Sequence, residues 1–381
     1  MGSGTDPWSR VRATGARVGG GSVAPGIRLI TISLALGSSL VTFGPRRTAK
    51  QDVATQWHNV PRATHPVLLV NPRSGGGKVQ HFGLLDACAA RSIDTVVLAP
   101  GDDLRSLAQS AVERGADVIG MAGGDGSLAV VAEVARQEGM PFVCVPVGTR
   151  NHFALDLGID RSDPIGALES FGSAHEGAVD LGCVNGRIFV NNVSLGLYGT
   201  MVASEDYRAE KLRTAAETIQ EHLGPTAPPY DLHLDGPDGP IDDPQVVEVS
   251  NNPYRLRSLT TFGTRARLDS GTLGVVTVRV GDPDDLERLL AAERERGFEA
   301  FPGVHSWAAA ELEVRSASSV VAGIDGEPAR LTPPLRFETV PHALRVRVPR
   351  SHRRVNRGLR SLPIGLALSL AEFGRTVLSG D

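Results

Sequence analysis

The sequence has few cysteines, no paired metal-binding histidines and little net charge. Cys88, Cys144 and Cys183 form no CxxC pair, which favours buried, reduced thiols of a cytosolic protein over a disulfide or zinc framework. The ten histidines include no HExxH pair, so a zinc centre has no support. The net charge of −4 argues against a general nucleic-acid binder. The uncharged stretch at 29–44 is shorter than the roughly 20 residues that span a bilayer.

The remaining composition, 41% hydrophobic and 22% charged, is that of a globular protein, and 381 residues suffice for about two domains. Apolar runs and helical segments alternate from 66 to about 158, which predicts a parallel sheet covered by helices, with ligands at the carboxyl ends of its strands. The strands expected here are 67–70, 95–98, 118–121 and 142–147, with a helix at 104–114.

After about residue 174, alternating runs separated by Gly, Pro and Asp turns predict a β-rich domain, a sandwich. Its expected strands are 187–193, 230–234, 246–249, 273–280, 311–314 and 344–348, with helices at 200–223 and 284–296. We therefore divide the chain into a leader (1–64), an α/β domain (65–174), a β-sandwich domain (175–350) and a basic amphipathic tail (351–381). The leader can be read as disordered sequence, as a weak membrane anchor or as the product of a wrongly assigned start.

A glycine turn with one acid, Gly123-Gly124-Asp125-Gly126-Ser127, follows an expected strand and opens an expected helix. Free N–H groups at a helix N-terminus bind phosphate. Asp125 would repel phosphate unless a cation lay between them, so the turn indicates a nucleotide–magnesium site. Residues 124–129 also fit a GxGxxG/A dinucleotide loop. That reading is weaker, because the turn follows the third strand and no acid ends the next one.

Three further segments carry polar groups at turns. Residues 71–78 resemble an ordinary βα turn and depart from the P-loop pattern, and residues 146–154 bring a hydroxyl and an amide to the same edge. Asp325-Gly326-Glu327 is either a plain hairpin turn or the carrier of a general base, Glu327, facing the nucleotide from the second domain. Phosphoryl transfer to an alcohol needs such a base.

In this order, the segments resemble the diacylglycerol kinase catalytic family, which includes bacterial lipid kinases and sphingosine and ceramide kinases. The resemblance covers about 66–348 and is carried by 71–75 (first nucleotide loop), 123–127 (GGDGT), 146–154 (PxGTxNDFA), 190–199 (start of the sandwich), 268–273 (DDGxL) and 325–327 (DGE).

This resemblance implies a phosphofructokinase- and NAD-kinase-like α/β domain followed by a β-sandwich, with ATP and Mg²⁺ between them and a lipid alcohol as acceptor. It implies Glu327 and Asp125 as catalytic residues, and Asp125 and Asp269 as metal ligands. The implied nucleotide-binding residues are Asn71, Ser74, Gly75, Gly123, Gly124, Asp125, Gly126, Ser127, Gly148, Thr149 and Asn151.

Three positions depart from the family pattern. His152 replaces an aspartate that helps organise magnesium, Ala129 replaces an asparagine, and Ser270 replaces the second acid of DDG. Two alternatives therefore stay open: a soluble-substrate kinase such as an NAD kinase, and a nucleotide-binding regulator that has lost catalysis. The sequence does not fix which lipid alcohol is used or the oligomeric state.

The end of the chain is basic. Its arginines either meet anionic headgroups, giving a cytoplasmic protein peripheral at the inner membrane face, or belong to a strand and a helix packed on the first domain. They are Arg345, Arg347, Arg350, Arg353, Arg354, Arg357 and Arg360.

Overall fold

The fold is known from a computed structural model that describes residues 56–197, 199, 230–254, 264–281, 284–285, 288–289, 291–292 and 297–351. The stretch at 29–44, the expected helix at 200–223, most of that at 284–296 and the tail beyond 351 lie outside these residues. Contacts divide the chain into Met1–Lys50 and Gln51–Asp381, and everything below concerns the second unit. No helix among the described residues is long and apolar enough to cross a membrane.

The first half of this unit is a parallel α/β sheet in the order β5-β4-β2-β3. Its strands are β2 (Pro66–Val70), β3 (Asp94–Val97), β4 (Val118–Gly123) and β5 (Phe142–Pro146). Every residue of β2, β4 and β5 is buried, as expected for apolar strands covered on both faces. The helices are α1 (Lys78–His81), α2 (Leu84–Ala89), α3 (Leu104–Glu113), α4 (Asp125–Gln137), α5 (His152–Asp156) and α6 (Pro164–Ala167), with short 3-10 helices at Ser74–Gly76, Leu168–Phe171 and Phe298–Ala300.

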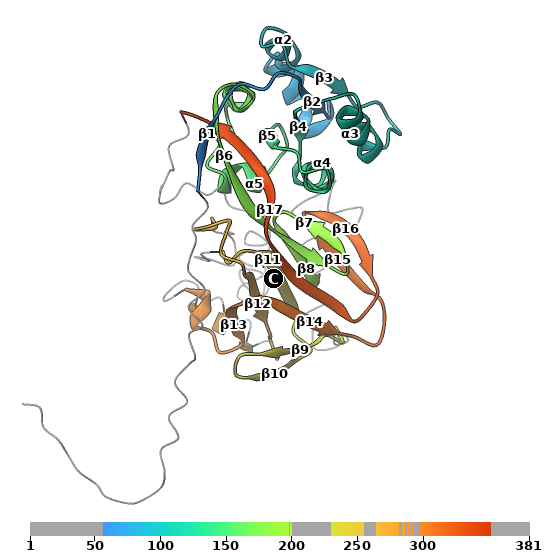
Figure 1. The fold of residues 1–381 in the computed structure, drawn as a ribbon. Coiled ribbons are helices and arrows are strands. Elements are labelled where there is room, and N and C mark those ends of the chain that lie inside the picture. The colour runs from blue at the N-terminus through green and yellow to red at the C-terminus, as the bar shows by residue number, and fades with distance from the viewer. Residues whose placement is uncertain are drawn as a thin grey trace, which may run out of the picture. The chain divides into compact units, whose positions relative to one another are not determined.

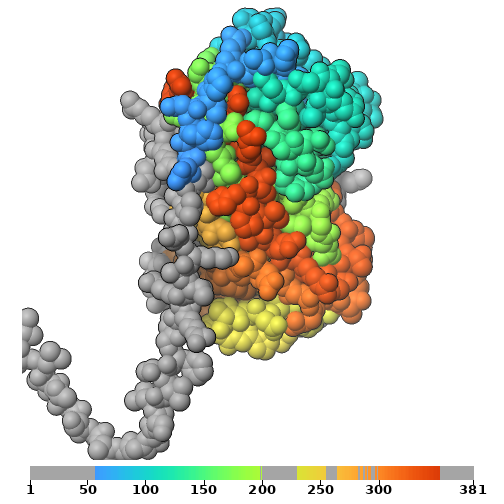
Figure 2. Space-filling model, viewed as in Figure 1, coloured from blue at the N-terminus to red at the C-terminus, as the bar shows by residue number. Residues whose placement is uncertain are grey.

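Two long antiparallel strands, β6 (Ala174–Val184) and β17 (Leu335–Pro349), run through both halves of the unit (Figure 1). The end of β17 pairs in parallel with β5, at Val346 and Phe142, and extends the α/β sheet. In the space-filling view the red strand crosses the visible face between the two halves (Figure 2). Strands β1 (His58–Val60) and β7 (Arg187–Phe189) pair with β6, and the whole forms one 11-stranded sheet.

The second half is a β-sandwich. One layer is the far part of the 11-stranded sheet, where β17 pairs with β14 (Glu311–Arg315), followed by β9 (His233–Gly236) and β10 (Gly239–Asp242). The other layer is a six-stranded antiparallel sheet in the order β13-β12-β11-β8-β15-β16. Its strands are β13 (Val304–Ala309), β12 (Leu273–Val278), β11 (Val246–Asn251), β8 (Asn192–Gly196), β15 (Val320–Ile324) and β16 (Glu327–Leu331). Phe337 from the first layer and Val249 from the second share one apolar core. The predicted fold class is confirmed.

One expected strand is divided. The run 187–193 forms β7 and the start of β8, with Val190 and Asn191 between them. The backbone N–H groups of these two residues donate to the carboxylate of Asp325 and not to the backbone of a neighbouring strand. The break therefore has a cause that lies 135 residues away in the sequence.

Candidate active site

Three nucleotide loops are expected along the chain: the first is 71–78, the second is the glycine turn 123–127 and the third is 146–154. The second glycine turn, at 123–127, joins β4 to α4. Gly124 is the N-cap of α4 in an extended conformation, and no side chain caps the helix there. The N–H groups of the first turn, at Asp125, Gly126 and Ser127, therefore face outward at the positive end of a 13-residue helix. This geometry suits the oxygens of a phosphate.

The three nucleotide loops expected from the sequence lie together because glycines let their backbones touch. A Cβ on Gly148 would lie 2.5 Å from the Cα of Gly124, and a Cβ on Gly75 would lie 2.1 Å from the carbonyl oxygen of Val147. Lys78 links the first loop to the third by donating from Nζ to the Gly148 oxygen at 2.8 Å. Larger residues at Gly75 or Gly148 would force these loops apart.

Hydrogen bonds of polar side chains stabilise the first and third of these loops. The Asn71 side chain accepts from the N–H of Arg73, and its carbonyl oxygen accepts from the N–H of Ser74. Asn151 has a positive φ of 53° and donates from Nδ2 to Gly148 at 2.9 Å. Its Oδ1 is buried and has no hydrogen-bond partner among the described residues. Thr149 is exposed at the tip of the third loop.

Asp125 connects the second loop to the third. Its Oδ2 accepts from the N–H of His152 at 3.1 Å and its Oδ1 from the N–H of Phe153 at 3.3 Å, so it holds the start of α5. The His152 ring lines a hollow beside Asp125. Burial lowers the pKa of His152, although the nearby Asp125 opposes this shift, so the ring is neutral at pH 7.

Asp325 fixes the hairpin between β15 and β16. Asp325 and Gly326 both have positive φ, 50° and 82°, as in a two-residue type I′ turn. The buried carboxyl accepts from the N–H groups of Val190 (2.9 Å), Asn191 (2.7 Å) and Asn192 (3.2 Å). Burial raises its pKa to about 7 despite these bonds. The turn is thus both a plain hairpin and an anchored part of the site.

Glu327, the first residue of β16, lies against the second glycine turn. A Cβ on Gly126 would be 2.6 Å from its Cγ and 3.2 Å from its Oε1. The side chain is exposed, so solvent and ligands can reach it. The sandwich thus brings the predicted base to the first turn of α4.

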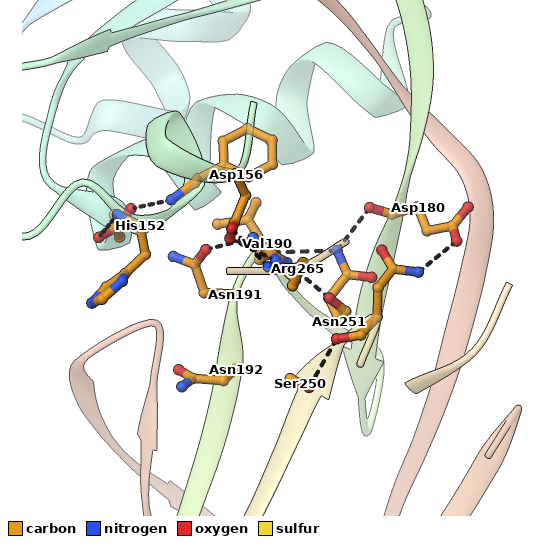
Figure 3. A network of polar contacts seen from close by, with 12 residues as sticks. His152, Asp156, Asp180, Val190, Asn191, Asn192, Ser250, Asn251 and Arg265 are labelled. Carbon is orange, nitrogen blue, oxygen red and sulfur yellow. Dashed lines mark hydrogen bonds and ion pairs between the residues drawn. The ribbon is translucent and has the colours of Figure 1, made fainter. Parts of the chain in front are cut away.

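A buried arginine joins the two halves of the site, and Figure 3 shows it at the centre of a polar network. Arg265 pairs with Asp156 of α5 at 2.7 Å, and both side chains are buried. It also donates to the carbonyl oxygens of Val190 (2.7 Å) and Asn251 (2.8 Å) and to the side chain of Asn191 (2.9 Å). Arg265 therefore links two segments. One is α5, whose first N–H groups bind Asp125, and the other is Val190–Asn191, whose N–H groups bind Asp325.

The sequence reasoning missed Arg265, Asp156 and a buried carboxyl on β11, Glu248. A single arginine or acid has no distinctive spacing, so no sequence signal marked them. The sequence motif included Asp325 without giving it a role. In the structure it accepts hydrogen bonds from the two residues between β7 and β8.

The expected metal ligand Asp269 is engaged otherwise, because Arg267 donates to it from Nε at 2.8 Å. An adjacent guanidinium does not suit a cation site, so no step below depends on Asp269. Within the described part of the chain, no three acidic, His or Cys side chains gather as a metal site. The assignment of a metal to Asp269 stays a prediction.

Two of the seven C-terminal arginines are also engaged. Arg345 and Arg347 on β17 both donate to Glu176 of β6, at 2.8 and 2.9 Å. Burial would raise the pKa of Glu176, but the hydrogen bonds from these arginines outweigh it and lower the pKa. These two positions join strands of the sheet. Arg353, Arg354, Arg357 and Arg360 lie outside the described residues.

The chain is similar to known lipid kinases. Residues 65–184 match the profile of the diacylglycerol kinase catalytic domain. A "Diacylglycerol kinase" of Mycobacterium tuberculosis is 27% identical over 211 residues, covering 51% of this chain and 66% of that protein. A "Probable lipid kinase YegS-like" of Pseudomonas aeruginosa is 28% identical over 297 residues, covering 74% and 94%.

The fold has a solved counterpart. A crystal structure of a diacylglycerol kinase from Bacillus anthracis superimposes with a TM-score of 0.55 at 17% identity, covering 77% of this chain and all of that one (100%). Residues 65–184 thus form a diacylglycerol kinase catalytic domain, and the chain is similar to lipid kinases, which are phosphotransferases with an alcohol acceptor.

Proposed function

We propose that the protein transfers the γ-phosphate of ATP to the hydroxyl of a lipid alcohol such as diacylglycerol, with Mg²⁺. The observation that carries the proposal is the contact of Glu327 with Gly126, which sets a carboxylate beside a helix N-terminus suited to phosphate. The names of the relatives support a lipid acceptor.

The loops fit a nucleotide by two features. The close approach of Gly124 and Gly148 keeps side chains away from the surface above them, and the uncapped first turn of α4 offers N–H donors. The buried Oδ1 of Asn151, which has no hydrogen-bond partner among the described residues, adds an acceptor beside Gly148.

The acid set also fits Mg²⁺ of the kind that kinases use. Such ions take one or two carboxylates and complete their shell with phosphate oxygens and water, so a three-residue cluster is not required. Asp125 would hold the ion, because each of its oxygens has a further lone pair beyond its single N–H bond. When bound, ATP and Mg²⁺ supply the phosphoryl group and neutralise its charge.

The chain's own residues then have separate tasks. Glu327 accepts the proton of the acceptor hydroxyl, and the N–H groups at Gly126 and Ser127 bind phosphate oxygens. Asp325 keeps the hairpin, and with it Glu327, in place through the backbone N–H groups that it binds. A neutral His152 adds no positive charge and no hard oxygen ligand beside Asp125.

The test is transfer of labelled γ-phosphate to a total lipid extract in vesicles, with wild type and Glu327→Ala. We expect a labelled lipid with wild type and a loss of at least about 100-fold in rate with the variant, the usual scale for a general base. We also propose that the protein contacts the membrane surface peripherally. Co-sedimentation of the protein with the same vesicles tests this contact. ATP binding without transfer to any lipid would contradict the proposal and favour a regulator, with His152→Asp as the next variant.

A further inference from the structure

A second buried carboxyl lies beyond the catalytic hairpin, on the face of the six-stranded sheet away from the sandwich core. Glu248 on β11 is directly opposite Ser194 on β8, while its neighbours Val247 and Val249 face the core. Glu248 is 6% exposed. Its Oε2 accepts from the Ser194 hydroxyl at 2.5 Å, and its Oε1 accepts from the side-chain amide of Asn192.

The partners of Glu248 are neutral. Within the described part of the chain no arginine or lysine pairs with it, although buried carboxylates are normally paired with a cation. A carboxylate offers about four acceptor sites, and these two bonds use one on each oxygen. Acceptor capacity therefore remains for a ligand that brings hydrogen-bond donors.

Glu248 also lines a hollow that adjoins the catalytic one. The hollow beside Asp125 and Asp325 has Asn192, Ser194 and Tyr254 in its wall. The second hollow shares Tyr254, and its wall contains Glu248, to which Asn192 and Ser194 donate.

The rest of the second wall mixes apolar residues, Pro253 and Val276, with the polar Ser250 and Ser306. Val275 and Trp307 also line it, but their side chains lie on the core face of their strands, opposite to that of Glu248. A molecule that extends from the hairpin would thus meet one acidic group and then the apolar surface of Val276 and Pro253. This order matches the head of a lipid followed by its chain.

We propose that Glu248 selects the acceptor by binding a hydrogen-bond donor, an ammonium or a second hydroxyl, that stands next to the hydroxyl to be phosphorylated. The proposal rests on the lipid-kinase function above and narrows its substrate class. Diacylglycerol carries only ester oxygens beside its hydroxyl, and these accept hydrogen bonds. Monoacylglycerols and long-chain amino alcohols carry the required donor, so they are the favoured acceptors.

The test compares three acceptors of matched chain length in mixed micelles: a 1,2-diacylglycerol, a 1-monoacylglycerol and a long-chain 2-amino alcohol. Wild type, Glu248→Gln and Glu311→Gln, an exposed control on β14, are assayed with each. We expect wild type to prefer the donor-bearing acceptors. Glu248→Gln should lower their kcat/KM about 10- to 100-fold, as for a lost hydrogen bond to a charged group, and change that of diacylglycerol less than twofold.

An equal loss on all three acceptors, or a wild-type preference for diacylglycerol, would overturn the proposal. If Glu248→Gln does not fold, Glu248→Asp serves in its place, because it keeps the charge but withdraws the carboxyl from the hollow. A larger effect on the amino alcohol assigns the ammonium, and a larger effect on the monoacylglycerol assigns the hydroxyl.

Binding gives a readout that does not need transfer. Isothermal titration of wild type and Glu248→Gln with short-chain, water-soluble forms of the same lipids reports their binding. Binding of donor-bearing lipids that Glu248→Gln weakens, in a protein that transfers no phosphate, would support the role of Glu248 and contradict the proposed function. Binding that the substitution leaves unchanged would overturn the role of Glu248.

Discussion

At the scale of single residues, the missing Cβ of Gly126 lets the side chain of Glu327 lie against the first turn of α4. Gly126 is the position over which Glu327 crosses the first turn of α4, and no larger residue fits there without moving that carboxylate. In the proposed function the glycine would therefore serve both the base on the other sheet and the phosphate at its own helix.

Gly126→Ala should separate activity from stability. The added methyl would lie 2.6 Å from Glu327 Cγ, so the carboxylate must shift. We expect kcat to fall roughly 10- to 100-fold, the scale of a small misplacement of a reacting group. Thermal unfolding should show no loss of stability, because alanine is a better helix former by about 1 kcal/mol. In the double variant with Glu327→Ala the two losses should not add, and additive losses would disprove a shared cause.

Glu248 should also make the stability of the fold depend on pH. Burial raises its pKa from 4.5 to about 7. The folded protein then holds a proton that the unfolded chain has released, so stability falls as pH rises between about 4.5 and 7, by up to about 1.4 kcal/mol per pH unit. Urea unfolding of wild type and Glu248→Gln across this range should show a flatter curve for the variant. Parallel curves would mean that Glu248 does not titrate in this window.

Residue types at the site were readable from the sequence, but their partners were not. The acid at Asp125 predicted a cation, and this stays a prediction. The structure shows that Asp125 accepts from two backbone N–H groups at the start of α5. A carboxylate that caps a helix and one that binds Mg²⁺ look alike in a sequence. Asp325 is similar, because only the fold brings Val190 and Asn191 to it.

Among the elements, α5 and the segment between β7 and β8 depend on one ion pair. Arg265 bonds to Asp156 on the first and to Val190 and Asn191 on the second. These elements position Asp125 and Asp325, respectively, so the pair sets one half of the site relative to the other.

Arg265→Met should therefore cost both stability and rate. Removing one partner leaves Asp156 buried and uncompensated, which typically costs about 3–5 kcal/mol in unfolding free energy. Adding Asp156→Leu should recover much of this stability, because an apolar pair can replace a buried ion pair. We expect kcat to stay low in the double variant, since the bonds to Val190 and Asn191 are still missing. Full recovery of kcat would show that the pair only stabilises the fold.

The sequence predicted elements well where burial is uniform. The apolar runs at β2, β4 and β5 were read correctly, because strands covered on both faces need apolar residues throughout. Strand β6 was not predicted, since Glu176 and Asp180 interrupt its apolar pattern. Their partners, Arg347 on β17 and Asn252 beyond β11, are far away in the sequence.

At the scale of the whole molecule, β6 and β17 make the two halves one sheet. Each half has its own apolar core, and each core has one tryptophan packed against it, Trp57 in the α/β half and Trp307 in the sandwich. These two side chains report on the halves separately.

We expect the two reporters to unfold together. In a Trp8→Phe background, the variants that keep only Trp57 or only Trp307 should give the same urea midpoint, because unfolding either half breaks strands that the other needs. Midpoints that differ by more than the error of the fit would mean that the halves unfold independently.

The position of β17 also bears on how the chain is made. Residues 335–349 lie between β5 and β14, so each half receives an essential strand from the last of the described strands to be synthesised. Domains usually fold from the N-terminus while the ribosome still works. Here the edge of β5, complete by residue 146, must wait for 200 further residues before its neighbour Val346 emerges. A nascent chain stopped before residue 335 would expose that edge, the kind of surface that chaperones cover and other chains pair with.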